Sequence, residues 1–368
     1  MKFTVSREEL LKPLQMVVGV VERRQTLPVL ANVLVVLEGD RLSLTGTDLE
    51  VEVVARVDLP QPGESGETTV PAKKFADICR SLPEDAQIHI SEEDDKVVLR
   101  SGSSRFTLST LPAGNFPNVE QGAGHYRFAC SQAVVKQLID STSFAMAQQD
   151  VRYYLNGMLW EVAEQQLRCV ATDGHRLAMC SKTLEIDPAA EKLQAIVPRK
   201  GILELSRMLQ DEDASIEVVI GDKHMQVVTE RFTFTSKLVD GKFPDYERVL
   251  PRSGNNILFA DRQALRQAFS RVAILSNEKY RGVRLTLSEG TVVLVANNPE
   301  QDEAEEQLAV DYTGDNLEIG FNIGYLLDVT AVLQSERIKM SLADANTSAL
   351  IESPEDSEAL YVIMPMRL

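Results

Sequence analysis

The chain has 368 residues, of which 44% are hydrophobic and 25% are charged, and this ordinary globular composition indicates two or three domains of about 150 residues. No apolar stretch reaches the roughly 18 residues that span a bilayer, and the amino terminus has no secretory signal, so we expect a cytoplasmic protein without membrane contact. The net charge of −17 argues by itself against a nucleic-acid partner, because an acidic surface repels phosphate. The four cysteines have no metal-binding spacing, which is typical of a reduced protein.

The first 120 residues predict a regular order of strands and helices. A strand at Phe3–Ser6 leads into an amphipathic helix over 6–24 with Ser6 as N-cap, and a second helix over 71–82 has Pro71 in its first turn. Three alternating runs follow each helix and predict antiparallel hairpins: 33–37, 41–45, 50–55, 88–90, 96–100 and 105–110. The order is β-α-β-β-β-α-β-β-β, an α+β unit with two helices packed on sheet.

This unit recurs twice along the chain. The matching segments are Phe3–Ser6, Phe128–Ser131 and Phe259–Asp261; Val70–Phe75, Val197–Ile202 and, more weakly, Phe321–Leu326; and Arg105–Leu108 and Arg231–Phe234. The first set is spaced by 125 and 131 residues. Because the matches keep a fixed order, we predict three tandem domains: 1–122, 123–252 and 253–368.

The predicted helices carry an excess of positive charge. They cover 6–24, 71–82, 131–143, 198–210, 261–280 and 322–333. They hold 15 Lys and Arg against 9 Asp and Glu, although the whole chain is acidic. Glu favours helices as much as Lys and Arg do, so helix propensity alone does not explain the excess. It predicts a shared positive face that holds phosphates.

The sequence has no catalytic signature. Phosphate-loop, zinc-protease and nucleophile-elbow motifs are absent and the histidines lack zinc spacing, so we expect no cofactor and no metal. The acidic run Glu300–Glu306 is more typical of a solvated edge than of a metal site. A hydrolase or nuclease centred on Asp173 and His175 would need a nucleophile, and none is implicated with them. A small-molecule scaffold, the other rival, explains the repeats but not the cation excess.

Five segments resemble the beta subunit of bacterial DNA polymerase III, the replicative sliding clamp of proteobacteria: Thr45–Glu50, Asp150–Leu159, Ala171–Leu177, Phe243–Tyr246 and Met364–Leu368. The resemblance covers the whole chain without a large gap. It implies the DNA-clamp fold and a head-to-tail homodimer that forms a ring around double-stranded DNA. It also implies a non-catalytic processivity factor that tethers the polymerase III alpha subunit, the clamp-loader delta subunit, and other polymerases and repair proteins by short peptide motifs.

Helix dimensions agree with a dimeric ring. Helices pack about 9 Å apart and are about 10 Å wide, so a ring of six helices leaves a hole of less than about 10 Å. Twelve helices leave about 24 Å by the same geometry. B-form DNA is on the order of 20 Å across. Only a ring of two chains would admit DNA.

The dimer interface is predicted from strand alternation and from the resemblance. Phe106 and Leu108 lie on one face of an edge strand that needs a partner. The resemblance implies that Ile274 and Leu275 of the other protomer lie against them. Opposed charges complete the interface: Lys74 and Arg105 against Glu300, Glu303 and Glu305. Ordinary core packing is the alternative for the apolar residues.

A clamp must slide, so its DNA contacts are expected to reach phosphates and to read no sequence. The resemblance implies Arg24, Lys73, Gln149, Tyr153 and Tyr154 as contacts, and the cationic helices add Arg80, Arg199 and Lys200. Few phosphates would be contacted at once, which predicts weak, steeply salt-dependent binding. The two tyrosines are core aromatics in the alternative interpretation.

The resemblance also implies a peptide-binding pocket between the second and third repeats. Its residues are Leu155, Thr172, Gly174, His175, Arg176, Leu177, Pro244, Arg248, Val249, Ser348, Val362, Ile363, Met364, Pro365, Met366 and Arg367. Methionine suits such a site, because its flexible thioether adapts to different apolar peptides. We expect Arg176 and Arg367 to bind a peptide carboxylate or carbonyl. The segment Tyr361–Met364 is also apolar enough to complete the third sheet as a strand, and both roles are compatible.

Overall fold

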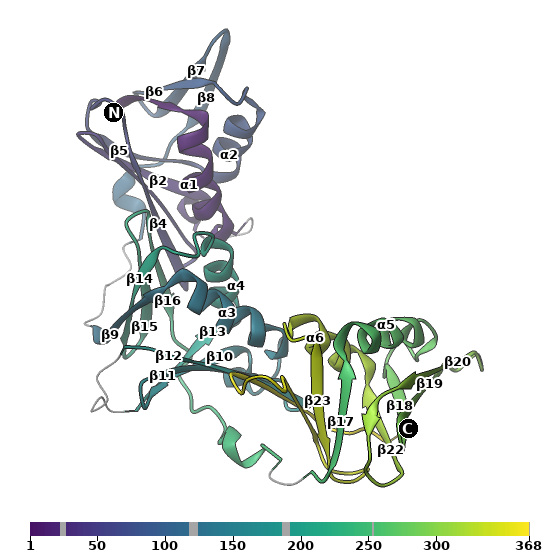
Figure 1. Ribbon diagram of the computed structural model, residues 1–368. Helices are drawn as coiled ribbons and strands as arrows, with labels where there is room; N and C mark the ends of the chain where they lie inside the picture. The colour runs from purple at the N-terminus through teal and green to yellow at the C-terminus, as the bar shows by residue number, and fades with distance from the viewer. Residues whose placement is uncertain (23–26, 118–123, 186–191, 252–253, 368) are drawn as a thin grey trace. The chain divides into compact units, whose positions relative to one another are not determined.

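The computed structural model describes residues 1–22, 27–117, 124–185, 192–251 and 254–367 (Figure 1). The chain divides into two compact units, one of Met1–Ala133 with Lys200–Leu238 and one of Val134–Arg199 with Val239–Leu368. The described residues contain no helix that is both long enough and apolar enough to cross a membrane.

Each predicted helix is present and begins within one residue of its predicted start. The helices are α1 (Arg7–Val20), α2 (Ala72–Ser81), α3 (Gln132–Thr142), α4 (Arg199–Met208), α5 (Arg262–Val272) and α6 (Ile323–Val332). All are slightly shorter than predicted, and two end four or more residues early: the backbone is extended at Val21 after α1, and α5 passes into a 3-10 turn, η6 (Ala273–Leu275). The hydroxyl of Ser6 accepts the Glu9 N–H at 3.2 Å, which caps α1 as predicted.

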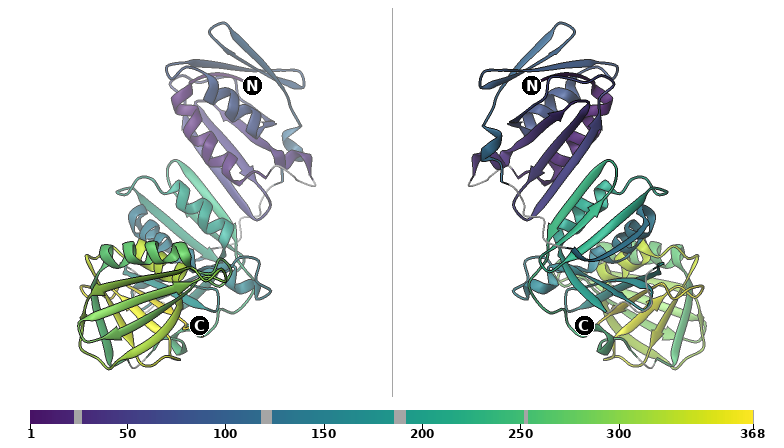
Figure 2. Two further views of the ribbon diagram at one scale, coloured as in Figure 1. Left: turned by 90° about the vertical axis from the view of Figure 1, so that its right-hand side faces the viewer. Right: turned by 90° about the vertical axis from the view of Figure 1, so that its left-hand side faces the viewer.

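The first unit contains an eight-stranded and a four-stranded antiparallel sheet (Figure 2). The larger is, in spatial order, β5 (Gly66–Pro71), β2 (Asn32–Glu38), β3 (Arg41–Thr47), β4 (Val51–Asp58), β16 (Phe232–Lys237), β15 (His224–Val228), β14 (Ser215–Gly221) and β9 (Gly124–Ser131). The smaller is β1 (Lys2–Ser6), β6 (Gln87–Glu93), β7 (Lys96–Ser101) and β8 (Ser104–Ser109). Helix α1 packs against α2, β3 and β4.

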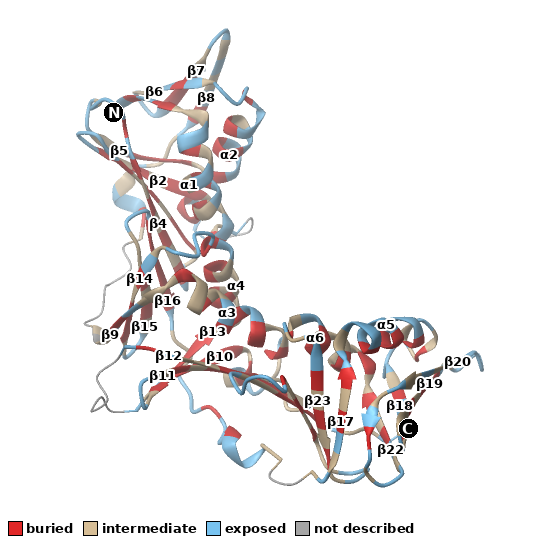
Figure 3. Cartoon of the chain, in the orientation of Figure 1, coloured by how far each residue is buried: buried red, intermediate tan, exposed pale blue. Residues whose placement is uncertain are grey.

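The second unit repeats this plan with a nine-stranded and a four-stranded sheet. The larger is β13 (Leu193–Pro198), β10 (Gly157–Ala163), β11 (Gln166–Thr172), β12 (Arg176–Thr183), β25 (Ala359–Ile363), β24 (Ala349–Glu352), β23 (Arg337–Leu342), β17 (Asn256–Asp261) and β21 (Asp311–Tyr312). The smaller is β20 (Glu303–Ala309), β19 (Thr291–Asn297), β18 (Gly282–Ser288) and β22 (Leu317–Asn322). Buried residues concentrate on the helix and strand faces that pack together within each unit (Figure 3).

The predicted α+β class and the triplication are confirmed. Within the described residues the first and second repeats have one strand more than predicted, and the third has two more because it also contains the short β21. Strands β5, β13 and β22 directly precede the second helix of each repeat. Pro71 and Pro198 therefore end strands, and the prediction that each lies in the first turn of a helix is wrong. Both strands lie at a sheet edge, where the missing N–H of proline is tolerated.

The repeats are joined by strand pairing that the sequence did not reveal. Strand β4 of the first repeat pairs with β16 of the second, and β12 of the second pairs with β25 of the third, both antiparallel. Each large sheet therefore combines strands of two repeats, and the two compact units do not follow the repeats. The three-domain division stays a prediction from the repeat pattern.

Candidate functional site

A cavity of about 170 Å³ opens in the second unit beside the junction of β12 and β25. Its lining residues are Arg152, Leu155, Thr172, Gly174, Arg176, Leu177, Pro244, Tyr246, Val249, Val362 and Met364. Leu155, Leu177 and Val362 are buried, whereas Met364 is 40% exposed. The cavity thus has a fixed apolar floor and a flexible thioether at its mouth.

The loop from Thr172 to Arg176 is held by its own side chains. The Thr172 hydroxyl donates to the Arg176 carbonyl at 2.6 Å and accepts the Gly174 N–H at 3.1 Å. The Asp173 carboxylate accepts the N–H groups of His175 and Arg176 at 2.9 and 3.1 Å. Asp173 therefore builds the loop, and its bond to His175 is to the backbone, so the pair forms no catalytic dyad.

Gly174 is required at the apex of this loop. Its φ of +89° lies in the left-handed region, and a Cβ there would stand 2.8 Å from Nη2 of Arg152. Arg152 itself binds the Asp150 carboxylate at 2.9 Å and donates to the Asp173 carbonyl at 3.2 Å. Arg152, which the sequence did not assign to the pocket, thus joins the preceding segment to the loop.

Arg176 is bound inside the chain rather than presented at the rim. Its guanidinium donates to both Asp173 (3.1 Å) and the Phe144 carbonyl (2.8 Å), and it pairs with Asp328 of α6. The ring of Tyr325 lies 4.4 Å from the guanidinium carbon. Because these partners occupy the guanidinium, Arg176 connects the loop to α6 and has little capacity left for the expected peptide carboxylate.

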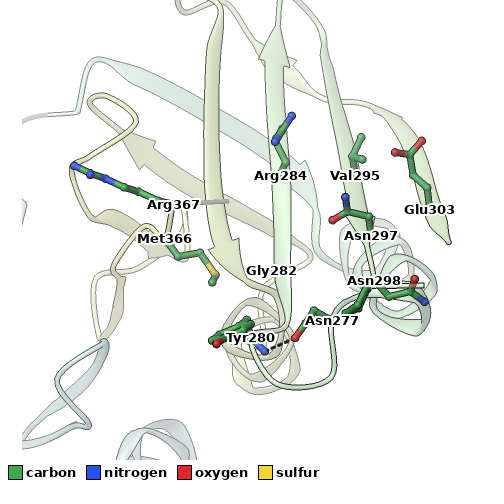
Figure 4. A pocket seen from close by; sticks show the side chains of 11 residues that line it. Asn277, Tyr280, Gly282, Arg284, Val295, Asn297, Asn298, Glu303, Met366 and Arg367 are labelled. Atoms are coloured by element: carbon green, nitrogen blue, oxygen red, sulfur yellow. Dashed lines mark hydrogen bonds between the residues drawn. The ribbon is translucent and has the colours of Figure 1, made fainter. Parts of the chain in front are cut away.

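The carboxy-terminal run divides between two cavities. Met364 donates its N–H to the His175 carbonyl at 3.0 Å and lines the first cavity. Met366 donates its N–H to the Gly320 carbonyl at 2.8 Å, and with Arg367 it lines a second cavity of about 530 Å³ (Figure 4). Terminal strand β25 lies between β12 and β24, so it completes the sheet of the third repeat, as the alternative interpretation had it, and also joins that sheet to the second repeat.

Nine of the sixteen predicted pocket residues line the first cavity. The seven others are placed elsewhere: Ile363 is buried in β25, Ser348 and Pro365 are half-buried, His175 and Arg248 are exposed, and Met366 and Arg367 line the second cavity. Tyr246 lines the first cavity without having been predicted, although it belongs to one of the segments that carry the family resemblance.

Known proteins match the chain over its full length. Models of the N-terminal, central and C-terminal domains of the DNA polymerase III beta subunit match residues 1–120, 129–245 and 247–367. The beta sliding clamps of Pseudomonas aeruginosa and Escherichia coli K12 are 61% and 55% identical to it, with 100% of both chains covered in each case. The crystal structure of a Pseudomonas aeruginosa sliding clamp bound to griselimycin, also 61% identical, superimposes with a TM-score of 0.98 over 100% of both chains.

The chain belongs to the DNA polymerase III beta subunit family of sliding clamps. This membership confirms the predicted fold and the predicted role as a non-catalytic processivity factor in DNA replication.

Five of the residues predicted for the clamp's dimer interface lie on two strands that end sheets in the described part of the chain, Arg105, Phe106 and Leu108 on β8 and Glu303 and Glu305 on β20. Strand β8 ends one four-stranded sheet and β20 ends the other. Leu108 is only 7% exposed and thus packs within its own chain, contrary to the expectation of an exposed apolar edge, while Phe106 is half-buried. Ile274 of η6 is 77% exposed and Leu275 is half-buried. The charged members are all exposed: Lys74, Arg105, Glu300, Glu303 and Glu305.

The residues predicted to touch DNA in this clamp differ in exposure. Lys73, Arg80 and Gln149 are exposed, Tyr153 is 57% exposed, Arg199 is half-buried, and Tyr154 packs against the core beside the cavity. Lys200 pairs with Glu22 and Asp48; burial alone would lower its pKa, but these carboxylates outweigh burial and raise it. Arg24 lies outside the described residues.

Proposed function

We propose that two copies of the chain close into a ring around duplex DNA and tether replication and repair proteins through the cavity beside Met364. The cytoplasm is the proposed location, since the four cysteines, all within the described residues, form no disulfide, as in a reducing compartment. The main evidence for the ring is the strand pairing that joins successive repeats.

A ring of two identical chains has six repeats and therefore six junctions, three for each chain. Two of these three lie within the chain. At each, the third strand after a repeat's first helix pairs with the last strand of the following repeat: β4 with β16, and β12 with β25. Among the described residues two strands lack such a partner. They are β20, which is the third strand after the first helix of the third repeat, and β8, which is the last strand of the first repeat. Pairing β20 of one copy with β8 of another repeats the same junction twice and closes a ring with no free edge.

Side chains near these edges support the pairing. Glu303 and Glu305 are exposed on β20, and Arg105 is exposed on β8, so opposite charges would meet. Ile274 would lose its large exposed apolar surface. Burial of apolar surface and complementary charge together favour the dimer over the separate chain.

DNA contacts in such a ring would be sequence-independent. Lys73 and Arg80 on α2, Arg199 on α4, and the exposed Gln149 and Tyr153 are the proposed contacts among the described residues. Arg24 and Tyr154 remain family-based proposals. Of the predicted contacts, Lys200 should contribute least to DNA binding, because Glu22 and Asp48 already neutralise its charge.

The cavity is the proposed tether for the polymerase III alpha subunit, the clamp-loader delta subunit, and other polymerases and repair proteins. Short segments that are disordered when free would dock their apolar side chains over Leu155, Leu177 and Met364. Because griselimycin binds a 61% identical clamp, we also propose it as a ligand of this cavity.

Removing residues Met364–Leu368 tests the tether. We expect a folded dimer that still encircles DNA but retains no polymerase and no longer binds griselimycin in a calorimeter. Ile257→Ala is a matched control, since Ile257 is 36% exposed in the same unit and lines neither cavity described above. Polymerase retention and griselimycin affinity that survive the deletion would place the tether elsewhere.

A further inference from the structure

One wall of the cavity is formed by a segment that belongs to no sheet. Residues 239–250 contain only the 3-10 turn η5 (Tyr246–Arg248), and they contribute Pro244, Tyr246 and Val249 to the cavity. The Val239 N–H donates to the Ile196 carbonyl at 2.8 Å where the segment begins. Since Pro244 and Val249 are exposed, their positions depend on what anchors the segment between them.

Phe243 and Tyr246 are the buried side chains of this wall, and Tyr246 is the one that lies between Pro244 and Val249. It is 4% exposed and packs in the core cluster with Leu159, Val170 and Leu177. Its hydroxyl donates to Oε1 of Glu161 at 2.7 Å and accepts from Nη1 of Arg168 at 2.8 Å. Besides the Val239 N–H at its start, the wall is thus tied to the sheet by the buried hydroxyl of Tyr246.

The pairing of two strands places Glu161 and Arg168 where both can bond to the Tyr246 hydroxyl. They lie opposite each other on β10 and β11, and their side chains form an ion pair of 2.9 Å. Glu161 is 1% exposed, and its second oxygen binds Lys192 at 2.8 Å and the amide of Gln194 at 2.6 Å. A buried carboxylate is costly unless it is fully bonded, and here it is.

The protonation states fix the direction of these bonds. Burial by itself raises the pKa of Glu161, but hydrogen bonds from Lys192, Tyr246 and Gln194 outweigh it and lower the pKa overall. Burial raises the pKa of Tyr246 to about 12. At neutral pH the carboxylate therefore accepts and the phenol donates.

We propose that Tyr246 is a positioning residue for the cavity: Glu161 and Arg168 hold its hydroxyl, and this contact sets the places of Pro244 and Val249 in the wall. The inference rests on the cavity's proposed function as a ligand site. It adds that ligand affinity depends on a hydroxyl whose partners lie beneath the wall and not in the cavity.

Tyr246→Phe removes the hydroxyl and keeps the ring. We expect griselimycin affinity to fall about three- to tenfold and trypsin to cleave after Lys242 or Arg248, both exposed, several times faster than in the parent chain. Saturating griselimycin should restore the resistance to trypsin. Glu161→Gln, which keeps an acceptor but loses the charge, should shift both measurements in the same direction by less.

Tyr312→Phe is the matched control. Tyr312 is equally buried in the same unit, and its hydroxyl donates to the Asp315 carbonyl away from the cavity, so its loss reports on general stability. If Tyr246→Phe and Glu161→Gln match Tyr312→Phe in both measurements, the inference is overturned. If the parent chain does not bind griselimycin, the proposed ligand of the cavity is wrong instead, and the trypsin measurement still decides whether the hydroxyl holds the wall.

Discussion

Thr47 and Thr172 lie 125 residues apart in the chain and make the same pair of hydrogen bonds. The Thr47 hydroxyl donates to the Val51 carbonyl at 2.9 Å and accepts the Leu49 N–H at 3.0 Å. Thr172 bonds to Arg176 and Gly174 in the same way. The loop at the cavity is therefore an element that the first and second repeats share. The loop of the second repeat differs in that it lies beside the cavity.

The aspartates that follow these threonines should be structural. Asp48 and Asp173 each accept two backbone N–H groups, so either Asp→Ala change should lower the free energy of unfolding by about 1–3 kcal/mol. Urea unfolding measures this, with the exposed Asp85→Ala expected to stay within about 0.5 kcal/mol. Unchanged stability in both loop variants would show that the loops hold without these carboxylates.

The dimer should depend on η6. Ile274→Ala combined with Leu275→Ala should yield folded monomers with the 40.8 kDa mass of one chain by sedimentation, because the exposed apolar surface that favours association is removed. Tyr280→Ala, which also changes a 57% exposed side chain in this repeat, should leave the dimer intact. A double variant that sediments like the parent dimer contradicts the proposed interface.

Two lysines should affect DNA binding differently. Lys73→Ala should reduce the slope of log affinity against log salt by up to about 1, because an exposed cation that meets phosphate is lost. Lys200→Ala should leave this slope unchanged and lower the stability by about 1–3 kcal/mol, because the buried Asp48 loses its partner. The reverse pattern would make Lys200 the DNA contact.

The buried thiols should stay protonated, and therefore unreactive toward alkylating reagents, until the pH is strongly alkaline. Burial raises the pKa of Cys79 and Cys130 to about 12 and that of Cys180 to about 11, from 9.0. The folded chain holds these protons more tightly than the unfolded chain, so the unfolding free energy should fall as pH rises above about 9. At pH 8 iodoacetamide should label the native thiols far more slowly than the urea-unfolded ones, as mass spectrometry would show; equal rates would contradict the burial.

Local patterns were sufficient to predict the helices and hairpins. Ser6 and Asp261 mark helix starts because their side chains accept backbone N–H groups, and both do so in the structure. The strand Gly66–Pro71 was missed because Val70 is its only large apolar side chain before the final proline, and a proline at that place also indicates a helix start. Proline is compatible both with the end of an edge strand and with the first turn of a helix, so the residue type alone did not distinguish the two.

Long-range placement was beyond those patterns. The pairing of Arg176–Cys180 with Ala359–Ile363 joins segments about 180 residues apart, and no local spacing records it. Arg152 and Tyr246 were not assigned to the pocket for the same reason, since each reaches it through contacts with a distant loop or strand. The burial of Leu108 likewise depends on tertiary packing, which strand alternation does not specify.

Retention on circular duplex DNA tests the central claim most directly. The chain, loaded onto a nicked circle by its clamp loader, should stay bound at a salt concentration that abolishes ordinary phosphate contacts, because a closed ring is linked topologically. Cutting the circle once should release it, whereas the Ile274→Ala, Leu275→Ala monomer should not be retained at all. Release that is equally fast from the circle and from the cut DNA, or retention that persists after cutting, would contradict the ring.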